Sequence, residues 1–396
     1  MSQQPAGLSY DPTDPSFFQN PYPAYDEMRA KGHCFFWQEY GHWCFPGFDD
    51  VNGLLRDRRF GCQIEDRTGE SALGRFEKNS LLELEPPAHT RLRRLVNRAF
   101  VSRQVERQRS TIAKLAHRLI DGFEPDGQVN LLSAYAEVIP LVVICELLGV
   151  PTEMAGQLLS WSHKMVAIYE HGRNEAVDQA AEEAAAEFET FIKREIDCKR
   201  KNPADDLLTE LIQVEEAGDR LDHDELVATC ILLLNAGHEA TVHGIGNGVK
   251  CILENNVDVA RWFATGETTK ILVEECLRFD APLHMFTRYA LQDLTYKGRN
   301  FARGDVIGLM LGAANRDSRK FSNPHLFDPE RGGTGHVTFG AGIHFCVGAP
   351  LARLELEIAL PVLFERLPEL HLAEEPVYAS RYHFHGLDRL DLSWEV

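Results

Sequence analysis

The sequence lacks the features that mark disulfide-rich, membrane-spanning and nucleic-acid-binding proteins. Its nine cysteines are odd in number and include no C-x-x-C pair, which argues against a disulfide framework or a zinc ribbon and fits a reducing compartment. No apolar run approaches the ~20 residues of a membrane-spanning helix, and the first residues do not have the cationic start and apolar run of a secretion signal. Lys and Arg number 41 against 60 Asp and Glu, a net charge of −19, whereas phosphate contacts need clustered cations. We therefore expect a cytoplasmic protein that binds neither a membrane nor a nucleic acid.

The residues that are present describe a globular protein with a large core. Apolar residues make up 44% of the 396-residue chain and charged residues 26%, a balance typical of folded rather than disordered proteins. No repeat, low-complexity tract or Gly/Ser linker interrupts the chain. We predict one domain over residues 1–396 with an irregular segment at 1–20.

Hydrophobic periodicity predicts a mainly α fold with a minor β region. The pattern indicates a short helix, a hairpin, a helix-poor segment, a long helical region and a group of short strands, at residues 21–32, 33–46, 61–82, 87–280 and 285–311 in that order. One expected helix of 33 residues at 222–254 would be ~50 Å long, although Gly244, Gly246 and Gly248 weaken its last third. There is no β-α-β alternation, which excludes a doubly wound sheet.

Two motif-like spacings do not carry their usual chemistry. His238, Glu239 and His243 resemble a zinc-protease signature, but that signature needs its histidines at i and i+4. Here they are at i and i+5, on different faces of a continuous helix, so we expect no zinc site. Gly340 and Gly342 begin a dinucleotide-binding pattern, but its third glycine would fall on Phe345.

The strongest signal is a Gly-rich loop that delivers one cysteine to the start of a helix. The loop reads FGAGIHFCVG at 339–348, and the helix begins near Pro350. A helix N-terminus favours a thiolate over a thiol, and the glycines allow a flat ligand to approach the backbone. Cys346 is therefore a candidate axial ligand of haem iron. The alternative is a buried structural cysteine, which we expect of the other eight.

The loop resembles the haem-binding loop of the cytochrome P450 family, F-G-x-G-x-H-x-C-x-G, at all six fixed positions. The resemblance extends over roughly residues 20–396 and is to the soluble, bacterial-type members. It implies a cytochrome P450-like fold, with haem b between a long central helix and the helix that follows the Cys loop. The cofactor-binding residues implied within the loop are Phe339, Gly340, His344, Cys346 and Gly348.

The resemblance also implies a structural ion-pair network. Glu275 and Arg278 fit the family's E-x-x-R at i and i+3, on one helix face. Arg331 lies in a segment similar to the one that brings a further arginine to that pair. Without the Cys loop, a solvated pair on the surface of a helix would be the preferred interpretation.

Cationic side chains must hold the two haem propionates. His89 and Arg93 are at i and i+4 and share a helix face. The resemblance implies that they bind propionate together with Arg288 and His344. Each of these residues taken alone is more often a surface residue.

The expected central helix contains a segment similar to the family's oxygen-binding stretch, A-G-x-[D/E]-T. The resemblance implies that Ala236 and Gly237 leave room for oxygen, and that Glu239 relays protons. The usual Thr is replaced by Ala240. Thr241 is one residue further, about 100° round the helix, and is not expected to take that role unaided. Our hypothesis is that ordered water or a substrate hydroxyl stands in.

The resemblance implies a monooxygenase that uses O₂ to oxidise a hydrophobic small molecule, with electrons from a ferredoxin and its NAD(P)H-dependent reductase. A basic run could attract an acidic ferredoxin or could simply be a solvated face; it comprises Arg91, Arg94, Arg98 and Arg103. One alternative is a hydrogen-peroxide-driven peroxygenase of the same fold. Another is a haem-thiolate gas sensor without turnover.

Substrate contacts are inferred from position in the family. The apolar candidates are Ile64, Leu73, Phe76, Tyr169, Leu233, Met285, Phe286 and Phe384, and possible polar edges are His284, His383 and His385. The alternative for each apolar residue is ordinary core packing, which we expect for about half of them.

Overall fold

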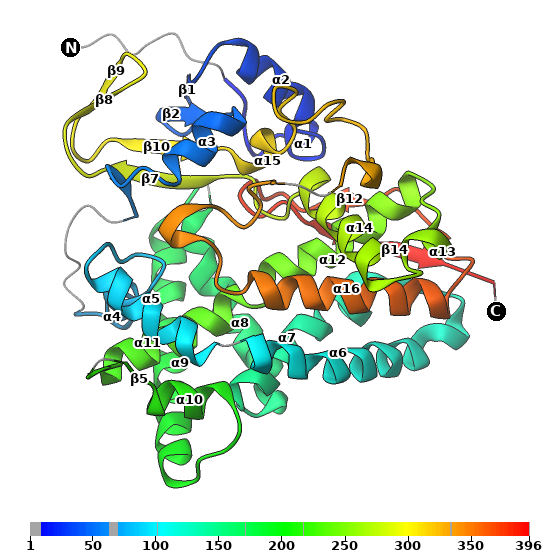
Figure 1. Cartoon of the computed structure of the whole chain (residues 1–396), viewed down its shortest axis with the longest axis horizontal. Helices are drawn as coiled ribbons and strands as arrows, with labels where there is room; N and C mark the ends of the chain where they lie inside the picture. Colours follow the sequence, from blue (N-terminus) through cyan, green and yellow to red (C-terminus); the bar gives the residue numbers. More distant parts are fainter. Residues whose placement is uncertain are drawn as a thin grey trace.

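A computed structural model describes residues 9–62, 70–100, 102–170, 172–216, 218–332 and 335–395. It is mainly helical, with small sheets (Figure 1), in agreement with the predicted fold class. The α-helices are α1 (Pro15–Phe18), α2 (Tyr22–Ala30), α3 (Phe48–Leu54), α4 (Ala72–Asn79), α5 (Ala88–Ala99), α6 (Ser102–Phe123), α7 (Val138–Leu148), α8 (Ala155–Val166), α9 (Glu175–Lys201), α10 (Leu207–Gln213), α11 (His223–Ala236), α12 (Glu239–Glu254), α13 (Val259–Trp262), α14 (Gly266–Phe279), α15 (Leu311–Ala314) and α16 (Ala349–Arg366). Shorter helical turns are η1 (Glu124–Asp126), η2 (Leu132–Ala136), η3 (Thr152–Met154), η4 (Ala167–Tyr169), η5 (Pro329–Arg331) and η6 (Gly342–His344).

The strands are short and form one principal sheet. They are β1 (Phe35–Trp37), β2 (His42–Phe45), β3 (Phe60–Gly61), β4 (Gln128–Asn130), β5 (Glu215–Glu216), β6 (Asp219–Arg220), β7 (Phe286–Ala290), β8 (Leu294–Tyr296), β9 (Arg299–Phe301), β10 (Val306–Leu309), β11 (His371–Leu372), β12 (Val377–Tyr378), β13 (Leu387–Arg389) and β14 (Asp391–Ser393). The five-stranded sheet has the order β1-β2-β10-β7-β3 and is antiparallel except for the β2–β10 pair. The predicted hairpin at 33–46 and the strands predicted within 285–311 are confirmed.

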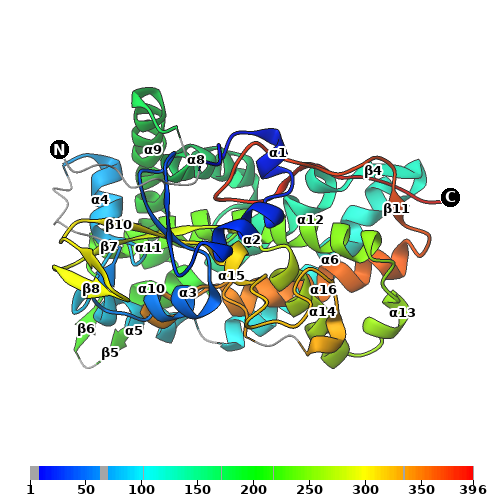
Figure 2. The same cartoon turned by 90° about the horizontal axis from the view of Figure 1, so that it is seen from above.

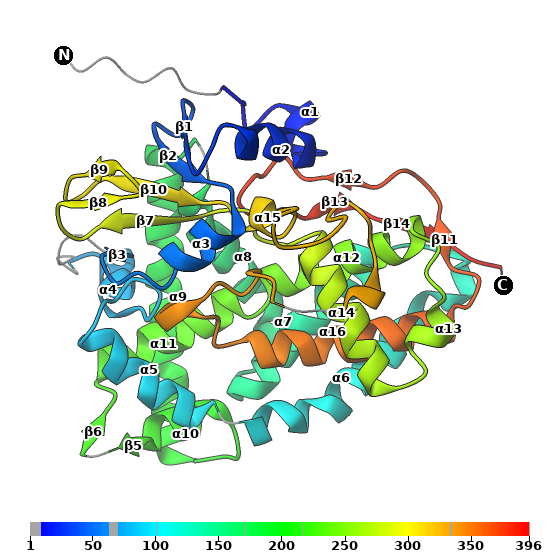
Figure 3. The same cartoon turned by 45° about the horizontal axis from the view of Figure 1, so that its top comes forward.

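The sheet and the N-terminal helices lie together at one side of a larger helical body (Figures 1 and 2). The core of that body includes α7, whose sequence VIPLVVICELL is apolar almost throughout, as expected for a helix covered on nearly every side. Figure 3 shows α16, in orange, running close to α12, α14 and α6. The helix that follows the Cys loop is therefore embedded in the main core.

The expected helix at 222–254 is wrong as a single element, because it breaks between α11 and α12 at Gly237 and His238. A Cβ at Gly237 would lie 2.5 Å from the Leu233 carbonyl oxygen, and His238 turns its ring Nδ1 back to the Leu234 carbonyl at 2.9 Å. Such a local side-chain bond competes with the helical hydrogen-bond ladder. The glycines that seemed weak points lie inside α12, where Gly248 lets Leu360 of α16 approach to within 3.5 Å of its Cβ position.

Two further expectations need correction. Residues 61–82 are not helix-poor, because α4 forms there. Tertiary contacts stabilise this helix, since the backbone N–H groups of Ala72 and Leu73 donate to the Glu182 carboxylate of α9. The first 20 residues are not wholly irregular either, because α1 forms there and buries Phe17 and Phe18. No helix among the described residues is long and apolar enough to cross a bilayer.

A capping box fixes the start of α11. The Asp222 carboxylate accepts from the Glu225 N–H at 2.8 Å, and the Glu225 carboxylate accepts from the Asp222 N–H at 3.0 Å. We expect Asp222→Ala to lower the free energy of unfolding by about 1 kcal/mol, measured by urea denaturation. Asp222→Asn, which retains a capping oxygen, should retain most of that stability. Equal losses in the two variants would contradict the capping role.

Candidate functional site

The Cys loop is held by its own backbone. The Cys346 N–H donates to the Phe339 carbonyl at 3.0 Å, and η6 lies between the two residues. Gly342 has a φ of +72°, and a Cβ there would come within 2.5 Å of the Leu55 carbonyl oxygen. Only glycine fits this turn, which places Cys346 three residues before α16.

Cys346 is an exposed residue, and competing effects act on the pKa of its thiol. Burial by the surrounding chain raises the pKa of the thiol, while the backbone N–H groups of Gly348 and Ala349 and the Arg93 guanidinium lower it. The predicted effect of the helix N-terminus is thus present, but burial outweighs it. A metal ion bound to the sulfur would favour the thiolate.

The structure brings Glu275, Arg278 and Arg331 into one buried cluster. Arg278 donates to both Glu275 oxygens at 2.7 Å, and the Arg331 Nε donates to one of them at 3.1 Å. The same oxygen accepts from the Asp328 N–H at 2.8 Å. Glu275 is completely buried, so the solvated-pair interpretation does not hold.

The neighbouring carboxylate, Glu274, contacts both sides of the Cys loop. It accepts from His336 at 3.1 Å, before the loop, and from the Arg353 Nε at 2.5 Å, after it. Burial raises the pKa of Glu274, but these two partners more than offset this and lower the pKa to about 2. Sequence reasoning missed Glu274, although it adjoins the E-x-x-R motif.

Three of the four expected propionate partners lie near one another or near the Cys loop. The rings of His89 and His344 are 4.3 Å apart, and Arg93 is close enough to Cys346 and His89 to affect their pKa values. Burial, followed by His344 and Arg93, lowers the pKa of His89 to about 4. Arg288, on β7, is buried and donates to the Thr287 carbonyl at 2.8 Å.

These residues fit a ligand that carries carboxylates on a flat apolar body. Neither ring nitrogen of His89 has a hydrogen-bond partner within the described part of the chain, whereas Nε2 of His344 lies 3.4 Å from the Glu85 carboxylate. Ala236 is exposed at the end of a buried helix, so accessible space reaches the helix break. Val347 of the Cys loop and Leu232 of α11 pack against one apolar cluster. The loop, the break and α5 thus surround a common region.

The helix break makes Glu239 the first residue of α12, where the helix dipole favours a carboxylate. Glu239 is buried and has histidines at both oxygens: His163 and His238 at Oε2, and His243 at Oε1. The Arg381 guanidinium also contacts Oε1 at 3.2 Å. Burial raises the pKa of Glu239, but contacts with His163 and His243 outweigh it, so the net shift is downward. Glu239 is ionised in this setting.

A second buried carboxyl, Glu355 of α16, was missed from the sequence. It is completely buried, and neither of its oxygens has a well-formed hydrogen bond to another described residue. Burial raises its pKa well above the usual range, although the Thr241 hydroxyl lowers it in part. Glu355 is therefore a neutral acid facing Thr241. The signal in the sequence is a glutamate directly between two buried leucines, Leu354 and Leu356.

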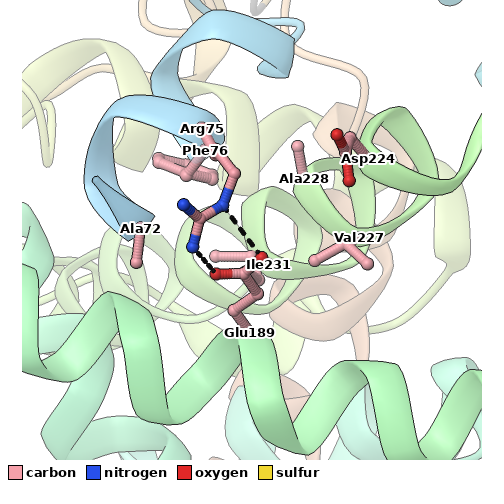
Figure 4. A pocket seen from close by; sticks show the side chains of 8 residues that line it. All are labelled: Ala72, Arg75, Phe76, Glu189, Asp224, Val227, Ala228 and Ile231. Atoms are coloured by element: carbon pink, nitrogen blue, oxygen red, sulfur yellow. Dashed lines mark hydrogen bonds and ion pairs between the residues drawn. The ribbon is translucent and has the colours of Figure 1, made fainter. Parts of the chain in front are cut away.

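The substrate candidates divide into pocket and core residues. Phe76 lines a small pocket between α4, α9 and α11 (Figure 4). Leu73 and Leu233 are buried in the main core cluster, and Phe286 and Phe384 are half-buried. Tyr169 is 38% exposed and donates from its hydroxyl to Glu83 at 3.1 Å.

Other expected substrate contacts lie in buried clusters or outside the described residues. Met285 packs in the N-terminal core cluster. His284 and His385 stack on each other, and His284 contacts the Tyr25 hydroxyl while His385 lies by Asp280, so they belong to a buried network. His383 is buried 3.6 Å from Glu170. Ile64 lies outside the described residues.

Figure 4 shows an ion pair within the pocket of Phe76. Arg75 of α4 makes two hydrogen bonds to the Glu189 carboxylate of α9, at 3.1 and 2.6 Å. Around them are apolar side chains and one further acid, namely Ala72, Phe76, Val227, Ala228, Ile231 and Asp224.

The basic run is less available to an acidic redox partner than the sequence suggested. Arg91 pairs with Glu225, and Arg94 pairs with Asp219 at 3.1 Å. Arg98 is exposed on α5, and the Arg103 side chain lies outside the described part of the structure. Local acids therefore partly neutralise the run.

Comparisons with known proteins agree with this arrangement. The sequence model of the family described as Cytochrome P450 matches residues 267–374. "Polyketide biosynthesis cytochrome P450 PksS" of Bacillus subtilis (strain 168) is 34% identical, covering 98% of each chain. "Vitamin D(3) 25-hydroxylase" of Pseudonocardia autotrophica is 37% identical, covering 96% of this chain and 94% of that protein. "Cytochrome P450 monooxygenase PikC" of Streptomyces venezuelae is 36% identical, covering 96% and 92%.

The fold agrees as well. A solved structure of P450BioI in complex with hexadec-9Z-enoic acid ligated acyl carrier protein matches with a TM-score of 0.91 and 31% identity, covering 96% of this chain and 99% of that one. The solved structure of PksS from Bacillus subtilis 168 matches with a TM-score of 0.89 and 32% identity, covering 98% and 100%. Since relatives more than 30% identical cover nearly its whole length, this chain belongs to the cytochrome P450 family.

Proposed function

We propose that this P450 monooxygenase uses Cys346 as its iron ligand and inserts one oxygen atom of O₂ into a hydrophobic small molecule, by hydroxylation or epoxidation. The observation that carries the proposal is the Gly-rich loop, which places the exposed residue Cys346 beside the N-terminus of α16. Members of the family bind haem b through a cysteine thiolate, and the bound haem supplies the oxygen-activating chemistry.

The chain's own residues hold and orient that group. Glu274 and Glu275 anchor the segments on either side of the Cys loop through His336, Arg353 and Arg331. His89, His344, Arg93 and Arg288 are proposed to hold the propionates, because the guanidinium groups are cations and both ring nitrogens of His89 are unpaired, while His344 already contacts one carboxylate, that of Glu85.

Two carboxyl groups supply different proton chemistry. Glu239 is an anion, positioned to accept protons from His163 or His243 and release them. Glu355 is neutral and can donate a proton through the Thr241 hydroxyl. This pair offers a route that does not need a hydroxyl at Ala240, and Thr241 takes part through Glu355 rather than alone.

The substrate class rests on membership of the family. The cavity between α4 and α11 has apolar walls formed by Ala72, Phe76, Val227, Ala228 and Ile231, but its volume of about 10 Å³ is too small for a substrate. The names of two relatives, which refer to polyketide biosynthesis and vitamin D(3), suggest polyketides and vitamin D(3) for a first ligand panel. A shift of the haem absorption band from low to high spin would identify binders.

We infer that electrons come from a ferredoxin and an NAD(P)H-dependent reductase. Support comes from Arg98, which is exposed on α5 and can attract an acidic partner. With a ligand that shifts the spin state, NADH plus a surrogate ferredoxin pair should give oxygenated product, and peroxide alone should give little. Equal or greater product with peroxide alone would favour a peroxygenase. No product with either source would favour a sensor.

The thiolate assignment has a direct spectroscopic test. We expect Cys346→His to bind haem but to give a reduced carbonyl adduct with an imidazole-type spectrum, because nitrogen replaces sulfur opposite CO. Cys198→Ser, which changes an exposed cysteine of α9, should keep the thiolate spectrum. A thiolate spectrum in Cys346→His would refute the assignment.

The proton route through Glu355 can be tested with an isosteric variant. We expect Glu355→Gln to lower product formed per NADH consumed roughly tenfold, with more peroxide released, because an amide cannot donate the proton. Ligand affinity from the spin-state titration should not change. Glu357→Gln, two residues further along α16 and half-buried, is the matched control.

A threonine hydroxyl at position 240 should compensate for the loss of the Glu355 carboxyl group. In the Glu355→Gln background, Ala240→Thr is expected to recover most of the product yield, since a second hydroxyl group then serves the same step. If Glu355→Gln alone leaves the yield unchanged, the route does not run through this carboxyl.

A further inference from the structure

The two oxygens of Glu239 have different surroundings. Oε1 faces His243 at 3.7 Å and the Arg381 guanidinium at 3.2 Å. Oε2 faces His163 at 3.2 Å and His238 at 3.6 Å. One oxygen therefore has a permanent cation beside it, whereas the other faces only imidazole nitrogens.

The tautomer of His238 leaves an unusual contact at Oε2. His238 Nδ1 lies 2.9 Å from the Leu234 carbonyl, and a carbonyl only accepts, so Nδ1 carries the hydrogen. In the neutral ring Nε2 is then a bare lone pair directed at an anionic oxygen. Nε2 of His238 and Oε2 of Glu239 are both buried without a well-formed hydrogen bond among the described residues, although His163 Nε2 lies 3.2 Å from Oε2.

A bound cation would turn this repulsion into attraction. Ligands of a tetrahedral zinc ion, each at 2.0–2.2 Å, lie about 3.3–3.6 Å from one another. The separations of Glu239 Oε2 from the two histidines, 3.2 and 3.6 Å, are close to that spacing. The three ligand atoms all lie within 4.8 Å of one another. Metal-binding histidines commonly donate their other ring N–H to a carbonyl, which fixes the orientation of the ring. The hydrogen bond from His238 Nδ1 to the Leu234 carbonyl is of this kind.

The site has a path from solvent. The His163 side chain is 48% exposed, whereas those of His238 and Glu239 are almost fully buried. His163 also lines a surface hollow with Lys164 and Asn174. An ion can therefore reach His163 first and then the two buried ligands.

We propose that His163, His238 and Glu239 form a binding site for a divalent transition-metal ion of the zinc type. On one continuous helix, His238 and His243 would lie on different faces and could not share a zinc ion. The break before α12 separates His238 from that face, and α8 supplies His163 in its place.

Another buried cluster, Asp280, His284 and His385, is a poorer metal site. The two imidazoles stack with centroids 4.1 Å apart and planes at 26°, so one ion cannot lie in the plane of both. Asp280 also accepts from the Tyr22 hydroxyl at 2.7 Å and has Lys250 at 3.9 Å. Its charge is already compensated.

An ion at this site would inhibit the enzyme, a consequence that rests on the proposed relay role of Glu239. Metal coordination would occupy Oε2 and the lone pairs of His163 and His238. Protons could then no longer pass between His163 and Glu239, and product formed per NADH would fall.

Equilibrium dialysis of the haem-loaded protein against chelator-buffered Zn²⁺ tests the site itself. The Cys198→Ser background removes an exposed thiol that could bind zinc. We expect one zinc per chain, and at least tenfold weaker binding in His163→Gln, which changes a half-exposed side chain. Lys164→Gln, the next residue of α8, and His325→Gln, a half-exposed histidine near Asp26, should bind zinc like the parent. No stoichiometric zinc, or unchanged affinity in His163→Gln, would overturn the proposal.

Measurements of product formation distinguish zinc binding from its effect on catalysis. Zinc should lower product per NADH in the parent, EDTA should restore it, and His163→Gln should respond much less, each relative to its own metal-free rate. If zinc binds as described but product yield does not change, the metal site stands and the relay role of Glu239 fails.

Discussion

The fold around the active site depends on one buried carboxylate. Glu275 receives two hydrogen bonds from Arg278, one from Arg331 and one from the Asp328 backbone. A fully buried charge is stable only when it is paired and hydrogen-bonded. Removal of one partner of such a pair typically lowers the free energy of unfolding by about 3–5 kcal/mol. Because Arg331 precedes the Cys loop and Glu274 binds its far side, the same turn of α14 fixes where Cys346 lies.

The break between α11 and α12 is the second constraint. It exposes Ala236 to the interior space, leaves Glu239 at a helix N-terminus and turns His238 back on the preceding turn. On a continuous helix the side chains of His238 and Glu239 would point about 100° apart. The proposed proton relay and the proposed metal site therefore both depend on the helix break, and both use the Glu239 carboxylate.

The wall of the pocket is held by charges rather than by apolar packing alone. Glu182 accepts from the first N–H groups of α4, and Glu189 binds Arg75 on the same helix (Figure 4). These contacts connect α4 to α9, so a movement of one helix involves the other. Partly exposed ion pairs of this kind are individually weak.

The sequence by itself determined the family, the mainly helical class and the residues of the Cys loop, because that motif is local and its glycines and cysteine have few substitutes. The sequence also predicted the E-x-x-R pair, since residues at i and i+3 share a helix face. Only the tertiary structure decided where α11 ends, that α4 is a helix, and that Met285, His284 and His385 belong to the core, because long-range contacts set each of these. The charges of Glu239 and Glu355 were decided in the same way, since burial and partners from other helices determine which carboxyl group holds its proton.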